Sequence, residues 1–360
     1  MNTLDTRPVY LTAASVFNAA GSECADLHGP LTIAQPLDFD PARLAYCVKT
    51  PRLPADVFDR KIQRGVEPQG ARLLYCAGRI APALSALNLP SQRIALMAAI
   101  PEVDGPSSCW DAVQAIGEQP DALLAQLFAH TPPLHALMML NSSVMAHVAQ
   151  ALHCNGPMGG FCSQGNAGVD ALIEAFHHIA DGRAEAAVVV SSSPNISPAL
   201  YLRENAECPV NAGPQLYGEG AAAVLLTSSA PTSGPMALRI AGFARGYSAS
   251  PERSNVVANN VIKQALSQEK LCLSDVERIV ADTQDSRLMS LFAETGRVIH
   301  SSRQMTGDLG ASALLTEVAL TFHDDRSERA QAHYTLLLNH SRAGHWGALL
   351  LANEVMEKHA

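Results

Sequence analysis

Strand-like runs that alternate with helix-like segments constrain the fold of this chain most strongly. The runs Val9–Val16, Arg93–Ile100 and Arg183–Ser193 are short and largely apolar, as buried strands are. Residues 70–89 carry leucine and isoleucine at helical spacing, and this helical segment ends just before Pro90. Strands and helices that alternate in this order predict an α/β protein with layered sheets.

The same alternation continues on the far side of a single linker. Further strands are expected at Tyr217–Leu226, Ala237–Ala244, Val276–Asp282, Tyr334–Leu338 and Gly347–Ala352, and further helices at 123–128, 134–151 and 256–267. Segment 134–151 is apolar on nearly all sides, which predicts a buried helix. Residues 228–236 are rich in Ser, Pro, Thr and Gly and form the linker. We therefore expect two halves, 1–230 and 237–360, that together make one globular unit.

Composition excludes several classes of protein. Hydrophobic residues make up 48% of the 360 residues and charged residues 16%, which suits a compact chain with much buried surface. The net charge is −9 and no basic stripe with interleaved aromatic residues occurs, so nucleic-acid binding is not expected. Residues 1–20 lack a signal-peptide pattern, and no run of about 18 apolar residues predicts a membrane-spanning helix.

The cysteines and histidines indicate neither a disulfide framework nor a metal site. The eight cysteines are scattered without a Cys-x-x-Cys or metal-like spacing. We interpret them as reduced, mostly buried thiols of a cytoplasmic protein. His177 and His178 have no partner at metal-ligand spacing. No metal and no other cofactor is therefore expected.

Five segments together resemble the β-ketoacyl synthases. They are the opening strand, Gly156–Val190, Tyr217–Leu226, Ser301–Ala313 and Asn339–Leu350. The most specific matches are the Gly-Glu-Gly-Ala run that starts at Gly218 and the Met-Thr-Gly run that starts at Met305. The resemblance covers nearly the whole chain. It implies the thiolase fold, in which two similar βαβαβαββ halves form a five-layer α/β/α/β/α domain.

The family's nucleophile is missing from this chain. In β-ketoacyl synthases a cysteine at a strand-to-helix turn precedes a small helix residue, here Gly168, by three positions, and that position falls on Gly165. A cysteine suits this place because a helix N-terminus favours the thiolate that takes the acyl chain. Glycine has no side chain and cannot be acylated.

The family's other catalytic positions are also changed. Two histidines that donate hydrogen bonds to the developing oxyanion fall on Asp282 and Asp308, the lysine of the Lys-x-Met-Thr-Gly pattern becomes Arg303, and the gating phenylalanine falls on Ala343. Ionised carboxylates accept hydrogen bonds and donate none, so two of them would repel an enolate. We interpret Asp282 and Asp308 as ordinary loop or helix-cap carboxylates.

The three residues before Gly165 are Cys162, Ser163 and Gln164, and none of them is an evident substitute for the nucleophile. Cys162 should still lie in the strand as a buried, inert thiol. Ser163 has no matching base nearby. Gln164 is one residue early for the glutamine that many chain length factors carry at the cysteine position. Either the local turn is shifted by one residue or Gln164 is a structural polar residue, and we favour the second interpretation.

The resemblance implies a chain length factor, the non-catalytic partner of an active ketosynthase in a type II polyketide synthase. It implies a heterodimer with that ketosynthase and transient contact with acyl carrier protein. The short, divergent sequence is similar to factors of aryl polyene pathways in Gram-negative bacteria. Two alternatives stay open: an active thiolase-fold acyltransferase with an unusual site around Cys162, Ser163 and Asp308, or a scaffold with no role in chain length.

In the family, the partner's contribution to the tunnel wall comes from the segment between the second strand and the buried helix. In this chain that segment spans about 109–145, and the tunnel or gate candidates within it are Trp110, Phe128, Leu134 and Met138. Most bulky residues of the segment must be ordinary core. Trp110 and Phe128 are the expected gates, because a large ring can block a tunnel that a smaller side chain leaves open.

Overall fold

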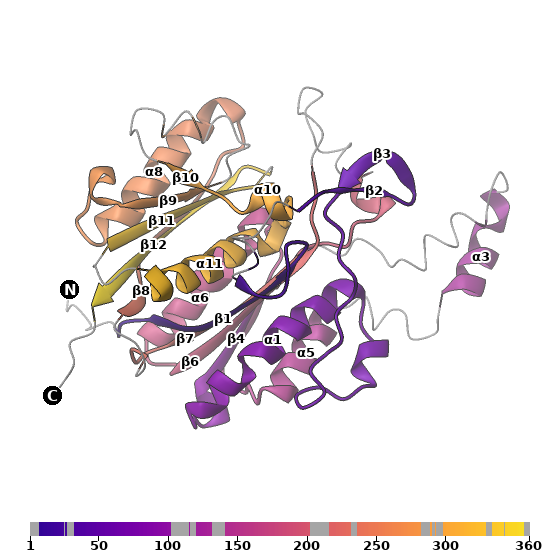
Figure 1. Cartoon of the computed structure of the whole chain (residues 1–360), viewed down its shortest axis with the longest axis horizontal. Coiled ribbons are helices and arrows are strands. Elements are labelled where there is room, and N and C mark those ends of the chain that lie inside the picture. Colours follow the sequence, from indigo (N-terminus) through magenta and orange to yellow (C-terminus); the bar gives the residue numbers. More distant parts are fainter. Residues whose placement is uncertain are drawn as a thin grey trace.

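Ten strands of the described residues form one mixed sheet, flanked by helices on both sides (Figure 1). The computed structural model describes residues 7–24, 26, 32–101, 115, 120–131, 141–201, 216–231, 236–281, 289, 292, 298–328, 333–341 and 343–355. The strand order is β10-β9-β11-β12-β8-β1-β7-β6-β4-β5.

The sheet consists of two half-sheets with the same internal pattern. The first contains β1 (Tyr10–Asn18), β7 (Gly220–Thr227), β6 (Ala186–Ser192), β4 (Ile94–Ala99) and β5 (Met158–Phe161). The second contains β8 (Met236–Tyr247), β12 (His345–Val355), β11 (His333–His340), β9 (Arg278–Ala281) and β10 (Ile299–His300). In each, the first two pairs of neighbours are antiparallel and the last two are parallel. β1 and β8 join the halves through two residue pairs, Tyr10 with Arg239 and Leu11 with Leu238.

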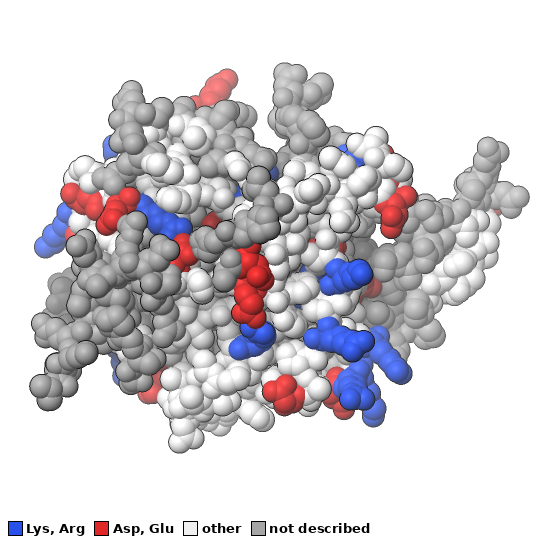
Figure 2. All heavy atoms as spheres, in the orientation of Figure 1, with Lys and Arg blue, Asp and Glu red and all other residues white. Residues whose placement is uncertain are grey.

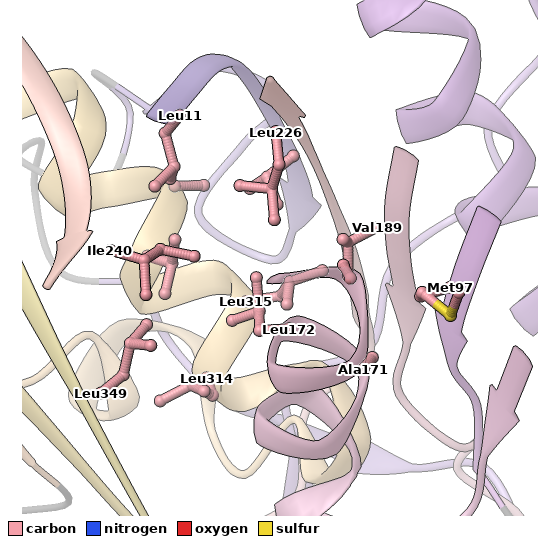
Figure 3. Packing of buried hydrophobic residues seen from close by; sticks show 14 of the residues in the cluster. Leu11, Met97, Ala171, Leu172, Val189, Leu226, Ile240, Leu314, Leu315 and Leu349 are labelled. Atoms are coloured by element: carbon pink, nitrogen blue, oxygen red, sulfur yellow. The ribbon is translucent and has the colours of Figure 1, made fainter. Parts of the chain in front are cut away.

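Two helices fill the space between the half-sheets. They are α6 (Ala167–Ala180) and α11 (Ala313–Glu328). Figure 3 shows Leu172 of α6 and Leu315 of α11 among side chains of both half-sheets, such as Val189 and Leu349. Burial of this apolar surface, at about 25 cal/mol per Å², is the main force that holds the two halves together.

Outer helices complete five layers. α1 (Pro68–Ala86) and α5 (Asn141–Ala151) cover the outer face of the first half-sheet, and α8 (Ser254–Ser267) covers the second. Outside these layers lie α3 (Leu123–His130), α10 (Arg303–Thr306) and the hairpin of β2 (Gln35–Leu37) and β3 (Asp40–Ala45). Short 3₁₀ turns occur at η2 (Ile62–Arg64), η3 (Ser91–Arg93), η4 (Pro120–Ala122), η5 (Gln164–Asn166), η6 (Pro251–Arg253), η7 (Leu273–Asp275) and η9 (Gly310–Ser312).

The structure confirms the predicted α/β class and thiolase-like layering. The prediction of a helix buried on all sides at 134–151 was wrong for the part that the structure describes, α5. This helix buries Val144, Met145 and Val148 on one face and exposes Gln150. Small residues on its other faces therefore do not mean that the helix is enclosed. Among the described residues, no helix is both long and apolar enough to cross a membrane.

Candidate functional site

The site expected around Gly165 is a sharp elbow between β5 and α6. β5 ends at Phe161, η5 covers 164–166, and α6 begins at Ala167. Gln164 has a φ of 50°, a left-handed conformation that costs a non-glycine residue about 1–2 kcal/mol. The chain therefore reverses direction at a strained residue, and Gly165 follows directly, at the start of the helix.

Gly165 has room for a side chain. A Cβ built at this position would lie 3.5 Å from Cβ of Ser341 and 3.7 Å from the carbonyl oxygen of His340, which are ordinary contact distances. Gly165 is not among the glycines with a left-handed φ. Its carbonyl oxygen accepts a hydrogen bond from Nδ2 of Asn339 at 2.6 Å. Neither backbone conformation nor space therefore requires glycine here.

Asp308 lies in a tight turn whose neighbour η9 packs against η5. Its Oδ1 accepts a hydrogen bond from the backbone N–H of Gly310 at 2.8 Å, and its Oδ2 lies 3.4 Å from Nη2 of Arg303. The backbone of Asp308 bonds with Leu216 and Gly218, so the turn is held on both sides. In this geometry the carboxylate caps the 3₁₀ turn and pairs with a guanidinium, and it acts as a hydrogen-bond acceptor.

The turn between β11 and β12 closes over the elbow. Ser341 is buried against Gly165, whereas Ala343, which the sequence resemblance predicts at the position of the gating phenylalanine, is exposed and carries no ring. Gly344 has a φ of 89°, and a Cβ there would lie 2.1 Å from the carbonyl oxygen of Ser248. His340 stacks on the buried Trp346 with ring centroids 4.1 Å apart. The turn is thus anchored at both ends.

The two possible substitute nucleophiles lie on the approach to the elbow. Cys162 is exposed and follows the last residue of β5, so the prediction of a buried thiol within the strand was wrong. The edge position of β5 leaves the chain uncovered there. The hydroxyl of Ser163 donates to Oδ2 of Asp170, and Oδ1 of that carboxylate lies 2.9 Å from Nη1 of Arg245. The prediction that Ser163 has no base nearby was therefore wrong, because the Asp170 carboxylate lies seven residues further along the chain, on the following helix, and was not recognised as its partner.

The thiols divide by burial. Among the described cysteines, Cys24, Cys76 and Cys154 are buried, whereas Cys47 and Cys272 are exposed like Cys162. Desolvation raises the pKa of Cys24 to about 11 and the pKa values of Cys76 and Cys154 to about 12. Those three thiols stay protonated at neutral pH and are not nucleophiles. The expectation of mostly buried cysteines therefore holds for half of the described ones.

A buried ion pair that the sequence analysis missed fixes the Gly-Glu-Gly turn. Glu219 lies with its Oε1 3.2 Å from Nη1 of Arg72, which is fully buried on α1. The other oxygen of Glu219 accepts a hydrogen bond from the N–H of Val48 at 3.0 Å. Burial lowers the pKa of Arg72, and Glu219 opposes this effect. The available signal was that Arg72, unlike the exposed Arg79 of the same helix, stands beside the apolar run Leu73-Leu74, because arginine is seldom fully buried without a partner.

The remaining site candidates divide into one that the structure describes and four that it does not. Phe128 lies on α3 and is 83% exposed. Asp282, Trp110, Leu134 and Met138 lie outside the described residues. The described part of the site thus brings together Gly165, Ser341 and the turn of Asp308, while Phe128 is on a separate element (Figure 1).

Sequence comparisons find no match, and structural comparisons find many. No protein-family model matches the chain, and no curated protein matches it. Among similar solved structures is the ishigamide ketosynthase/chain length factor, with a TM-score of 0.75 at 14% identity, covering 96% of this chain and 99% of that one.

Two further structures show the same similarity. The type II polyketide synthase complex AntDE:AntF, an acyl carrier protein with its ketosynthase bound to the hexaketide, has a TM-score of 0.72 at 14% identity over 96% of this chain and 99% of that chain. The ketosynthase ApeO with its chain length factor ApeC from Xenorhabdus doucetiae has a TM-score of 0.71 at 15% identity, over 97% and 98%. The chain therefore has the thiolase-like fold of ketosynthases and chain length factors.

Proposed function

We propose that this chain is a non-catalytic chain length factor that pairs with an active β-ketoacyl-ACP synthase and shapes its acyl tunnel in a type II system. The observation that carries the proposal is Gly165 at the elbow between β5 and α6. The fold retains the turn that would present a nucleophile at a helix N-terminus. The residue at that turn has no atom that can form a thioester.

The surroundings of Gly165 support loss of the condensing chemistry. A donor is needed where negative charge develops on the thioester oxygen, and the Asp308 carboxylate at the second histidine position is already an acceptor for Gly310 and a partner of Arg303. The exposed Ala343 provides no ring that could gate the elbow. These features support a subunit that does not condense acyl chains by itself.

Two exposed features support a protein partner. None of the eight residues of α3 is buried, and its Leu124 and Phe128 are 69% and 83% exposed, one helical turn apart on the same face. Figure 1 shows α3 to one side of the layered body. In addition, β5 forms one edge of the sheet and exposes Met158. Apolar side chains and an open strand edge of this kind favour a covering subunit, which we propose is the catalytic ketosynthase.

Phe128 is the described candidate for a tunnel gate, because it is large and faces away from the core. Trp110, Leu134 and Met138 stay candidates from the sequence. Truncating a gate should lengthen the product while the heterodimer still assembles. Truncating a core aromatic should cost about 3–5 kcal/mol and prevent assembly.

A basic segment supports transient docking of an acidic partner, for which we propose the acyl carrier protein. Residues 49–64 carry five exposed basic side chains, Lys49, Arg52, Arg60, Lys61 and Arg64, against two exposed acidic ones, in a chain with net charge −9. Figure 2 shows lysine and arginine side chains gathered over and beside α1. Opposite charges on two surfaces accelerate their encounter and orient it. Phe58, the one aromatic residue of this segment, is buried, so the exposed basic side chains have no aromatic residues interleaved at the surface.

Finer assignments belong to the same proposal. An aryl polyene pathway is proposed from the sequence resemblance, and a cytoplasmic location from the scattered cysteines, whose spacing indicates no disulfide framework. The division at 230 and 237 into two ketosynthase-like halves is also proposed. An intact ketosynthase with Cys-His-His encoded beside this chain would support the pathway assignment.

The function is tested by co-expression with a candidate ketosynthase, size-exclusion chromatography and mass analysis of the products. The chain should co-elute with the ketosynthase, and Phe128→Ala should change product length without loss of the heterodimer. A stable monomer that ignores the ketosynthase would contradict the proposal. Condensation of malonyl-ACP by this chain alone would favour the acyltransferase alternative instead.

A further inference from the structure

The elbow is held from the opposite half-sheet by a charged contact. Asp170, in the first turn of α6, receives the hydroxyl of Ser163 on one carboxylate oxygen and the guanidinium of Arg245 on the other. Arg245 belongs to β8, which opens the second half-sheet. A single carboxylate therefore joins the residue that begins the elbow to a strand of the other half.

The packing of β12 makes this contact possible. Gly347 of β12 pairs with Arg245 in the sheet. A Cβ at Gly347 would lie 2.5 Å from both Oδ1 of Asn166 and Cγ2 of Val169, so the start of α6 rests directly on this strand. The absence of a side chain at Gly347 lets α6 approach closely enough for Arg245 to reach Asp170 at 2.9 Å.

The charges at this contact agree with its position. A carboxylate in the first turn of a helix interacts favourably with the helix dipole. The side chain of Asp170 is 13% exposed and that of Arg245 is 55% exposed, so solvent screens the pair only from one side. Ser163 is fixed by Asp170, and its carbonyl oxygen accepts the N–H of Asn166 at 3.0 Å. The strained residue Gln164, with Gly165 after it, lies between Ser163 and Asn166.

We propose that Asp170 and Arg245 are positioning residues that hold the elbow in its sharp conformation and thereby fix the wall that this chain presents to the partner's acyl chain. The claim about the wall rests on the function proposed above, whereas the claim about the conformation of the elbow does not. Without the ion pair, the Asp170 carboxylate that accepts the Ser163 hydroxyl is no longer held in place, and the strained turn at Gln164 can relax.

The test compares four forms of the chain: wild type, Arg245→Gln, Arg245→Lys and Arg183→Gln. Arg183 is the matched control, because it pairs with Asp181 at 3.0 Å just beyond the C-terminal end of the same helix and is similarly exposed. Hydrogen exchange of the Asn166 amide, relative to amides of the buried strand β6, reports on the elbow. Product length is measured with each form paired to the ketosynthase.

In Arg245→Gln, exchange of the Asn166 amide should be roughly threefold faster, the range expected for loss of a partly exposed ion pair, and the product distribution should broaden while the heterodimer yield is unchanged. Arg245→Lys and Arg183→Gln should match wild type in both measurements. Unchanged elbow exchange in Arg245→Gln, or equal acceleration in Arg183→Gln, would overturn the positioning role.

The two proposals can fail separately. If the wild-type chain neither pairs with a ketosynthase nor affects product length, the proposed function fails, and exchange measured on the chain alone still tests the positioning role. If exchange rises in Arg245→Gln but product length stays the same in an assembled heterodimer, the elbow does not form part of the tunnel wall.

Discussion

Two glycines at the candidate site contrast in what the structure demands of them. Gly307 has φ 71° and ψ −170°, a conformation that essentially only glycine adopts, and a Cβ there would lie 2.7 Å from Cδ2 of Tyr46. Gly165 has no left-handed φ, and a Cβ there would make ordinary contacts. The first glycine is required by the fold. The second is not, and the proposed function attributes its missing side chain to the loss of a nucleophile.

The largest loss of stability is expected on breaking the buried ion pair of Arg72 and Glu219, which holds the Gly-Glu-Gly turn beside the Gly307 turn. Arg72→Met removes the partner of the buried Glu219, and a buried charge left without its partner costs about 3–5 kcal/mol of stability. Urea denaturation followed by circular dichroism measures the loss. Arg72→Met combined with Glu219→Gln should recover part of it. If the single variant is as stable as wild type, the Gly-Glu-Gly turn does not depend on this ion pair.

The two glycines are compared directly by the same substitution. Gly307→Ala forces a side chain into a glycine-only conformation and against Tyr46, so it should lose about 2–4 kcal/mol. Gly165→Ala should change stability by less than about 1 kcal/mol, because its backbone is already accessible to alanine. Denaturation midpoints of the two variants, measured side by side, show which of the two glycines the fold requires. Equal losses in both would mean that the fold requires Gly165 as well.

A smaller effect is expected in how stability depends on pH, through Glu317 of α11, which contacts the segment before the Gly307 turn. Glu317 of α11 accepts hydrogen bonds from the N–H and hydroxyl of Ser302 at 2.7 and 2.8 Å. Burial raises the pKa of Glu317 above its ordinary value of 4.5, although Ser302 and Arg278 oppose this. The folded chain then binds the proton more tightly than the unfolded chain, so the contribution of Glu317 to stability falls as pH rises above 4.5.

Glu317→Gln keeps an acceptor for Ser302 and removes the titration. The variant should therefore show a weaker fall in stability between pH 4.5 and 7 than wild type, and should equal or exceed it at pH 7. Thermal unfolding across this range measures the difference. A steeper fall in the variant would reverse the sign of the argument.

The sequence predicted the parts of the fold that depend on local patterns. Apolar runs located β4, β6, β7 and β12, because strands buried on both faces have no polar alternation. The β2–β3 hairpin was missed, since Pro36 and Pro41 lie in it and most of its residues are exposed. Short edge strands such as β10 carry too few residues to produce a pattern.

The site was predictable only where a motif gave positions along the chain. The motif located the elbow, and Gly165 indeed lies between β5 and α6. It could not show that Cys162 is exposed or that Arg72 pairs with Glu219, because both depend on segments distant in sequence. The contact of Asp170 with Arg245 likewise joins residues 75 positions apart. Such contacts follow from packing of the two half-sheets.

The central claim is that this chain takes no acyl group of its own, and intact-protein mass spectrometry tests it most directly. The chain alone, and the chain paired with a ketosynthase, would each be incubated with acyl-ACP. The account predicts an acyl adduct on the ketosynthase and none on this chain in either sample, because Gly165 offers no nucleophile. A stoichiometric adduct on this chain, mapped to Cys162 or Ser163, would contradict it.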